Sequence, residues 1–157
     1  MSVEIERKFL VKNDDFKKVS FQQKTLKQGY LNSDKNRTVR IRISDNQAFI
    51  TVKGISNDAG TIRFEWEKEI DIKEATEMLS LCEPTIIDKT RFLVKNGTHI
   101  FEIDEFYGEN KGLIVAEIEL NSEDESFEKP TWLGKEVTGI KKYYNANLSK
   151  FPFCDWK

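Results

Sequence analysis

Charged side chains of one sign recur at every second residue in several segments of this 157-residue chain. In Glu4-Ile5-Glu6-Arg7-Lys8, an extended backbone would place Glu4, Glu6 and Lys8 on one face, with successive members about 7 Å apart. Later segments repeat this spacing, and the members are Arg40 and Arg42, Glu65 and Glu67, Lys89 and Arg91, Glu102 and Asp104, and Glu117 and Glu119, with a single Lys53 between the first two pairs. Two like charges at that separation repel by about 2 kcal/mol at an effective dielectric constant of 20, so each charged face requires a partner of opposite sign.

Two kinds of ligand would supply that opposite charge. Paired carboxylates suit a hard cation such as Mg²⁺ or Mn²⁺, which takes a few protein oxygens and completes its shell with water and phosphate oxygens. Guanidinium and ammonium groups suit the phosphate oxygens themselves. A site with both halves favours metal-assisted transfer of a phosphoryl group to water. The alternative is that acidic and basic strands simply pair with one another and bind nothing.

Alternation with a period of two residues predicts the elements that carry these charges. The predicted strands cover residues 3–11, 25–32, 37–44, 47–53, 61–70, 85–95, 98–106 and 112–121. Short turns join most of them, and Asn96-Gly97 is a strong signal for a tight hairpin because both residues tolerate positive φ angles. Eight strands joined in this way indicate an antiparallel meander.

Two amphipathic segments predict helices at 72–82 and 139–150. Ala75, Met78, Leu79 and Cys82 form the apolar stripe of the first, and Ile140, Tyr144 and Leu148 that of the second. Such stripes would be covered if the helices packed on the outside of a barrel. The predicted fold is therefore mainly β (α+β), and Trp66, between Glu65 and Glu67, is expected to pack beneath a helix.

The composition narrows the class of protein. Charged residues make up 33% of the chain but the net charge is only −2, which argues against a basic nucleic-acid surface. No apolar run approaches the roughly 20 residues that span a bilayer, and charge begins at Glu4, so we expect a cytoplasmic protein. Two cysteines and one histidine suit neither a disulfide framework nor a zinc site.

The segment Glu4-Ile5-Glu6-Arg7-Lys8 also resembles the ExExK signature of the CYTH superfamily, the triphosphate tunnel metalloenzymes. Later segments resemble the family's blocks in order, through about residue 145, and they are Gln28-Gly29-Tyr30-Leu31, Val39-Arg40-Ile41-Arg42, Thr51-Val52-Lys53, Phe64-Glu65-Trp66-Glu67, Lys89-Thr90-Arg91-Phe92, Glu102-Ile103-Asp104-Glu105-Phe106, Ala116-Glu117-Ile118-Glu119-Leu120 and Glu136-Val137-Thr138. The resemblance implies a single domain over 1–157, in which residues 3–121 form an eight-stranded antiparallel β-barrel and 139–157 a C-terminal helix and tail.

The resemblance also implies roles for the charged residues. The expected catalytic set is Glu4, Glu6, Lys8, Glu117 and Glu119, and its four glutamates would hold two Mg²⁺ or Mn²⁺ ions together with Asp104, with Glu65, Glu67 and Glu102 as additional acidic groups. The expected triphosphate contacts are Lys8, Arg40, Arg42, Lys53, Lys89, Arg91 and one of Lys141 and Lys142, between which the sequence does not choose.

The chain looks most similar to the short bacterial members that hydrolyse inorganic tripolyphosphate. A class IV adenylate cyclase and a thiamine triphosphatase are alternatives within the family, and a polyphosphate-binding module without turnover is an alternative of another class. The complete acidic set argues against the binding module, because binding alone would need mainly the basic half. The expected partner is a small-molecule triphosphate, with no nucleic acid or membrane, and the protein would be a monomer or a homodimer.

Overall fold

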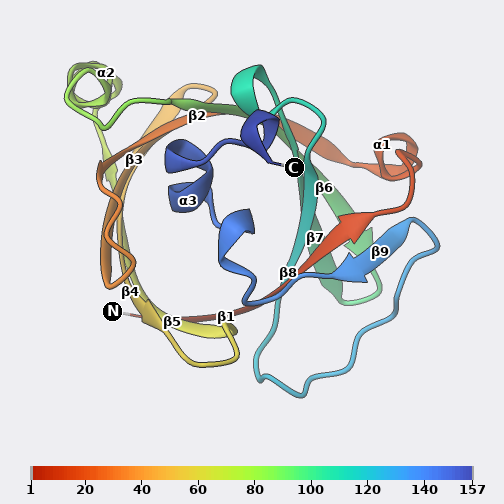
Figure 1. Cartoon of the computed structure of the whole chain (residues 1–157). Helices are drawn as coiled ribbons and strands as arrows, with labels where there is room; N and C mark the ends of the chain where they lie inside the picture. Colours follow the sequence, from red (N-terminus) through yellow and green to blue (C-terminus); the bar gives the residue numbers. More distant parts are fainter. Residues whose placement is uncertain (1, 157) are drawn as a thin grey trace.

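A closed ring of antiparallel strands forms the body of the molecule, and Figure 1 looks along its axis. The computed structural model describes residues 2–156. All eight predicted strands are confirmed, as β1 (Ser2–Val11), β2 (Gln22–Asn32), β3 (Arg37–Ser44), β4 (Gln47–Ser56), β5 (Ile62–Ile70), β6 (Ile87–Asn96), β7 (His99–Phe106) and β8 (Ile114–Glu119). A further short strand, β9 (Leu133–Glu136), lies beside the end of β1 and was not predicted.

The strand order around the ring is β5-β4-β3-β2-β6-β7-β8-β1, and β1 closes it. The first half of β1 pairs with β5, and the second half of β1 pairs with β8 on the other side. The register sets three pairs of opposite charges against each other, Lys8 with Glu117, Lys53 with Glu65 and Arg91 with Asp104, but it also sets Glu6 against Glu119 and Glu102 against Glu117. Since alternate side chains of a strand point to the same face, this register carries the charged positions together into the barrel.

Helices cover part of the outer face. The predicted helix at 72–82 is confirmed as α2 (Ile72–Leu79), whose first turn is capped by the Asp71 carboxylate accepting from the backbone N–H of Lys73. Its stripe packs on β3 and β4, where Ala75, Ile41 and Ala48 are all fully buried. A second helix, α1 (Phe16–Val19), buries Phe16 against Phe92 and Trp132 on another part of the wall.

The outer face of β5 has no helix over it. Phe64 is 40% exposed and Trp66 is 38% exposed. The expectation that Trp66 packs beneath a helix is therefore wrong. The helix that follows β5 in the chain turns away from it and lies over β2, β3 and β4.

The C-terminal segment differs most from expectation. The helix predicted over 139–150 is split into η2 (Lys141–Tyr143) and α3 (Asn145–Lys150), because Tyr144 between them has an extended backbone with φ −72° and ψ 138°. Ile140 is 40% exposed, so it takes no part in the predicted stripe. Leu148 is fully buried against Tyr30 and Phe106. A single straight helix could not have placed these residues in this way.

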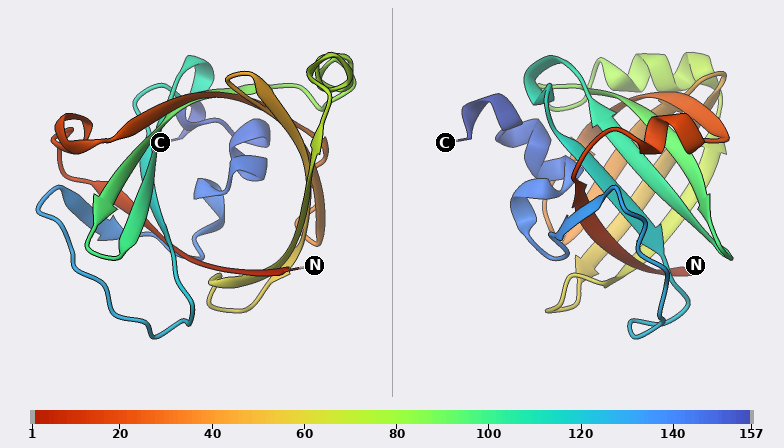
Figure 2. Two further views of the ribbon diagram at one scale, coloured as in Figure 1. Left: turned by 180° about the vertical axis from the view of Figure 1, so that it is seen from behind. Right: turned by 90° about the vertical axis from the view of Figure 1, so that its right-hand side faces the viewer.

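The same segment, residues 137–156, lies across one end of the barrel rather than along its outer wall, and it is called the C-terminal cap below. Figure 1 shows α3 within the outline of the ring, and the side view in Figure 2 shows the C-terminal helices at one end. The cap is joined to β1 at Lys8, whose backbone N–H donates to Thr138 Oγ1 over 2.9 Å and whose carbonyl accepts from the Val137 N–H over 2.8 Å. Two more short helices complete the structure. The first, η1 (Gly108–Asn110), follows β7, and the second, η3 (Phe153–Asp155), lies near the C-terminus of the chain.

Two glycines join this cap to the loop between β4 and β5. Gly60 and Gly139 both have φ +76°, and a Cβ atom added to Gly60 would lie 2.3 Å from the Gly139 Cα atom. Backbones can approach this closely only without side chains. The contact fixes where the cap leaves the barrel.

We expect Gly60→Ala to destabilise the protein far more than Gly97→Ala. Gly97 also has a positive φ, of 64°, but has nothing within 4 Å of an added Cβ. Both variants lose about 1–2 kcal/mol from the left-handed backbone, and Gly60→Ala loses roughly 1–3 kcal/mol more from the overlap. Urea unfolding of the two variants measures the difference, and equal losses would contradict the glycine contact.

Candidate active site

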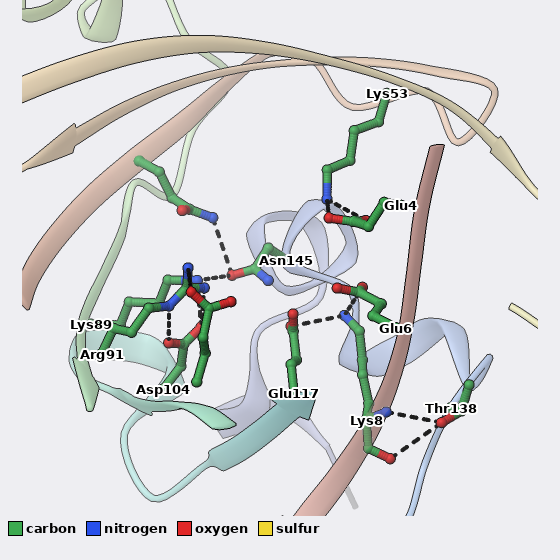
Figure 3. A network of polar contacts seen from close by, with 12 residues as sticks. Glu4, Glu6, Lys8, Lys53, Lys89, Arg91, Asp104, Glu117, Thr138 and Asn145 are labelled. Carbon is green, nitrogen blue, oxygen red and sulfur yellow. Dashed lines mark hydrogen bonds and ion pairs between the residues drawn. The ribbon is translucent and has the colours of Figure 1, made fainter. Parts of the chain in front are cut away.

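A cavity of about 370 Å³ lies between the barrel interior and the C-terminal cap. Six of the predicted site residues line it, namely Glu6, Lys8, Arg40, Lys53, Glu117 and Lys141. They come from β1, β3, β4, β8 and η2. Figure 3 shows the charged side chains of several strands pointing toward one another inside the ring.

Lys8 lies between two carboxylates on adjacent strands. Its Nζ atom is 3.4 Å from Glu117 Oε1 and 3.9 Å from Glu6 Oε1, and it lies 4.9 Å from the centre of the Tyr144 ring. Burial and then the Glu117 charge raise the pKa of Glu6 well above its usual value. Burial would also raise the pKa of Glu117, but Lys8 and Arg91 outweigh it and the net pKa is lowered. The two neighbouring carboxyl groups are thus crowded.

A second carboxylate pair surrounds Lys53. Its Nζ atom is 2.9 Å from Glu4 Oε1 and 3.5 Å from Glu65 Oε2. Burial, followed by the hydrogen bond and charge of Glu4, raises the pKa of Glu65 to about 7. As around Lys8, two acidic groups share one lysine, and a further positive charge would relieve the repulsion between them.

The two arginines of β3 converge on one acceptor. Glu67 Oε2 is 3.6 Å from Arg40 Nη2 and 3.4 Å from Arg42 Nη2, and it accepts a 2.7 Å hydrogen bond from Thr51. Among residues 2–156, the buried Nε–H groups of Arg40 and Arg42 have no hydrogen-bond partner. Burial and then the charges of Arg40 and Arg91 lower the pKa of Arg42 to about 10. These donors suit an anion in the cavity.

The wall formed by β6 and β7 holds a tighter network. Arg91 makes a bidentate pair with Asp104, with bonds of 2.8 and 3.0 Å, and also reaches Glu102 at 3.3 Å. Lys89 Nζ lies 2.8 Å from Asp104 Oδ2. Burial alone would raise the pKa of Asp104, but Arg91 and Lys89 bring it down to about 2. Burial lowers the pKa of Lys89 to about 7, although Asp104 opposes that shift.

The remaining predicted residues divide into two groups. Glu4, Arg42, Glu65, Glu67, Lys89, Arg91, Glu102 and Asp104 do not line the cavity but belong to the ion-pair networks around it. Glu119 is exposed, and the structure does not bring Lys142 into the cavity, because its ammonium lies 4.6 Å from the Trp156 ring centre. The six basic barrel residues all lie within 4 Å of a carboxylate, so the pairing of acidic and basic strands that the salt-bridge alternative predicted is present.

Some residues of the site escaped the sequence analysis. Arg63 lines the cavity and stacks its guanidinium 5.8 Å from the Tyr144 ring centre. It shares a face with Glu65 and Glu67, so alternation would have found it if runs of one sign had not been required. Gln28 and Thr51 stand in segments that resemble family blocks, but they and Asn145 are uncharged, and their hydrogen bonds are what connect them to the site.

The donor set fits a cation that takes few protein ligands. Across residues 2–156 no three Asp, Glu, His or Cys side chains form a ready-made cluster for a metal. The carboxylates instead come in pairs, Glu6 with Glu117 and Glu4 with Glu65, each crowded enough to raise one pKa. Oxygen pairs of this kind suit Mg²⁺ or Mn²⁺, which retain water and substrate oxygens as ligands.

Within residues 2–156, none of the helices has the length and apolar character that a membrane span requires.

Comparisons with known proteins agree with the barrel fold. The CYTH domain model matches residues 2–152. The chain is 44% identical to an inorganic triphosphatase of Acetivibrio thermocellus, over all of this chain and 99% of the relative. It is 35% identical to an inorganic triphosphatase of Nitrosomonas europaea, over 93% of this chain and 96% of the relative. The crystal structure of the inorganic triphosphatase NE1496 superimposes with a TM-score of 0.63, at 32% identity, over 93% of this chain and 97% of that one.

Proposed function

The chain belongs to the CYTH domain family, and from that premise we propose that it is an inorganic triphosphatase that splits tripolyphosphate inside its barrel. Relatives that cover almost the whole chain carry that name. The proposal extends the resemblance from the family to the reaction and the substrate.

One observation on this chain carries the proposal. The cavity is lined by Lys8, Arg40 and Lys53, while the buried Nε–H groups of Arg40 and Arg42 find no acceptor among the described residues. Buried donors without partners cost about 1–3 kcal/mol each, so an anion that accepts from them is favoured. A compact chain of phosphates offers many such acceptors at the right spacing for several strands.

The basic residues would bind and orient this chain of phosphates. Arg40 and Arg42 would supply directional donors from one wall, and Lys53 and Lys8 would act as point charges from two others. As substrate oxygens approach, these cations would exchange carboxylate partners for phosphate. They would then stabilise the negative charge that gathers on the departing phosphate.

The paired carboxylates would hold the divalent ions that the family uses. Glu6 with Glu117, and Glu4 with Glu65, are the pairs we assign to Mg²⁺ or Mn²⁺, with Glu119 and Asp104 as further ligands. Such an ion, when bound, neutralises phosphate charge and lowers the pKa of a bound water. We propose that two such ions bind, and that the protein is a cytoplasmic monomer or homodimer.

A phosphate-release panel tests the function. Tripolyphosphate, ATP, thiamine triphosphate and long-chain polyphosphate are supplied in turn, each with Mg²⁺ and with Mn²⁺. We expect the highest kcat/KM with tripolyphosphate. Cyclic AMP formation from ATP would instead favour the cyclase, and tight binding of polyphosphate without phosphate release would favour the binding module.

Lys141 and Lys142 give a sharper test of the cap. Lys141 lines the cavity and Lys142 stacks on Trp156, so we expect Lys141→Ala to raise the KM for tripolyphosphate several-fold and Lys142→Ala to leave it unchanged. The effect falls on KM because an exposed lysine contributes mainly a point charge to binding. Steady-state kinetics of the two neighbours decide the assignment, and the reverse order of effects would overturn it.

A further inference from the structure

A single oxygen of the cap holds two side chains of the barrel wall. The amide oxygen of Asn145, the first residue of α3, accepts from Lys89 Nζ over 2.9 Å and from Gln28 Nε2 over 3.1 Å. Gln28 is on β2 and Lys89 on β6, and these strands are neighbours in the ring. Figure 3 shows Asn145 reaching from the cap toward the Lys89, Arg91 and Asp104 network.

These contacts matter because both partners are buried. The Lys89 side chain is fully buried, and its polar contacts within residues 2–156 are Asp104 at 2.8 Å and Asn145 at 2.9 Å. An ammonium has three N–H donors. Asn145 is one of the two polar partners that fix the direction of the Lys89 ammonium. Asp104 alone would leave Lys89 free to rotate about one ion pair.

The buried side chain of Gln28 also depends on Asn145 for its hydrogen bonding. It has no exposed surface, and its Oε1 atom has no hydrogen-bond partner within residues 2–156. Its amide nitrogen bonds to Asn145. Without Asn145 the buried amide of Gln28 would lose that partner too, which adds to the cost of moving the cap away.

We infer that Asn145 is a positioning residue for the triphosphatase reaction, which fixes the Lys89 ammonium at the cavity-side face of the β6 wall when the C-terminal cap is docked. This inference rests on the proposed function. Asn145 lines the cavity and its oxygen is occupied by two protein donors, while Lys89 lies directly behind it, so the charged group that Asn145 holds in place for the phosphate is the ammonium. The cap thereby completes the site on the β6 wall, besides covering the end of the barrel.

Asn110 provides a matched control. Its side chain is also buried, and its Oδ1 atom also tethers the cap, by accepting from the Phe153 N–H over 2.8 Å. Among the described residues, the Asn110 side chain makes no hydrogen bond or ion pair with Lys89, Arg91 or Asp104. If Asn145 serves only to dock the cap, Asn110→Ala and Asn145→Ala should change activity alike.

The test is a double-mutant cycle on tripolyphosphate hydrolysis. We expect Asn145→Ala to lower kcat/KM about tenfold, Asn110→Ala to lower it less than twofold, and Asn145→Ala in a Lys89→Ala background to have less than a twofold further effect. Asn145→Ser, whose shorter side chain cannot reach Lys89, carries the comparison if Asn145→Ala does not fold.

Three outcomes would overturn the inference. Asn145→Ala and Asn110→Ala could have equal effects, the effects of Asn145→Ala and Lys89→Ala could multiply independently, or the Asn145 variants could keep full kcat/KM. In each case the unaltered protein still hydrolyses tripolyphosphate and the proposed function stands. Absence of turnover by the unaltered protein would overturn both.

Discussion

Replacing Glu117 by Gln is expected to lower kcat on tripolyphosphate by on the order of a thousandfold. Glu117 lines the cavity, faces Lys8 at 3.4 Å and forms a carboxyl pair with Glu6. The change keeps the size of the side chain but removes the charge that would attract a divalent ion, and Glu6→Gln should behave alike. Chelator should abolish the activity of the unaltered protein, and Mg²⁺ or Mn²⁺ should restore it.

Glu105→Gln is the control for this change. Glu105 lies on β7 and pairs with Lys17 of α1 at 3.0 Å, away from the cavity. Phosphate release and circular dichroism of the variants separate lost chemistry from lost folding. Full turnover by the Glu117→Gln protein, or by the unaltered protein in chelator, would refute the assignment of the acidic pair.

Replacing Arg40 by Ala is expected to lower kcat/KM about a hundredfold, most of it through KM. Arg40 lines the cavity and offers a buried Nε–H without a protein acceptor, so the structure gives it an unused donor for phosphate. Glu67 keeps Arg42 and Thr51 as partners, and the fold should survive. Arg40→Lys should recover only part of the loss, since an ammonium lacks the fork of donors.

Arg37→Ala provides the comparison on the same strand. The Arg37 side chain is 72% exposed and pairs with Asp34 at 3.6 Å, so its loss should leave both KM and kcat unchanged. Steady-state kinetics over a range of tripolyphosphate concentrations measure both constants. Equal effects of the two substitutions would mean that Arg40 acts through the overall charge of the protein.

The alternation of charged and apolar residues was enough to predict the eight strands and which side chains share a face, whereas the closed barrel was predicted from the family resemblance. A strand sends every second side chain to the same face, so Arg40 and Arg42 had to share a face whatever the neighbouring strands were. Their meeting with Glu67 was not predictable, because it depends on the register between β3, β4 and β5.

The structure of the C-terminal cap could be predicted only in part from sequence patterns. Leu148 is buried as its stripe predicted, but the stripe gave no sign of the break at Tyr144 or of the end of the barrel as its partner. Asn145 is uncharged and lies 117 positions from Gln28, so no local spacing joins them. Burial and hydrogen bonding in the folded chain alone single out such residues.

Closure of the ring by β1 has a consequence for how the chain folds as it leaves the ribosome. The first strand to be synthesised pairs with residues 62–65 and 115–119, so the ring cannot close until about three quarters of the chain has been made. Until then the edge of β1 that pairs with β8 is open to other chains, and unpaired edges promote aggregation. Charged side chains on a strand oppose such pairing, so Glu4, Glu6 and Lys8 also protect the nascent protein before any active site exists.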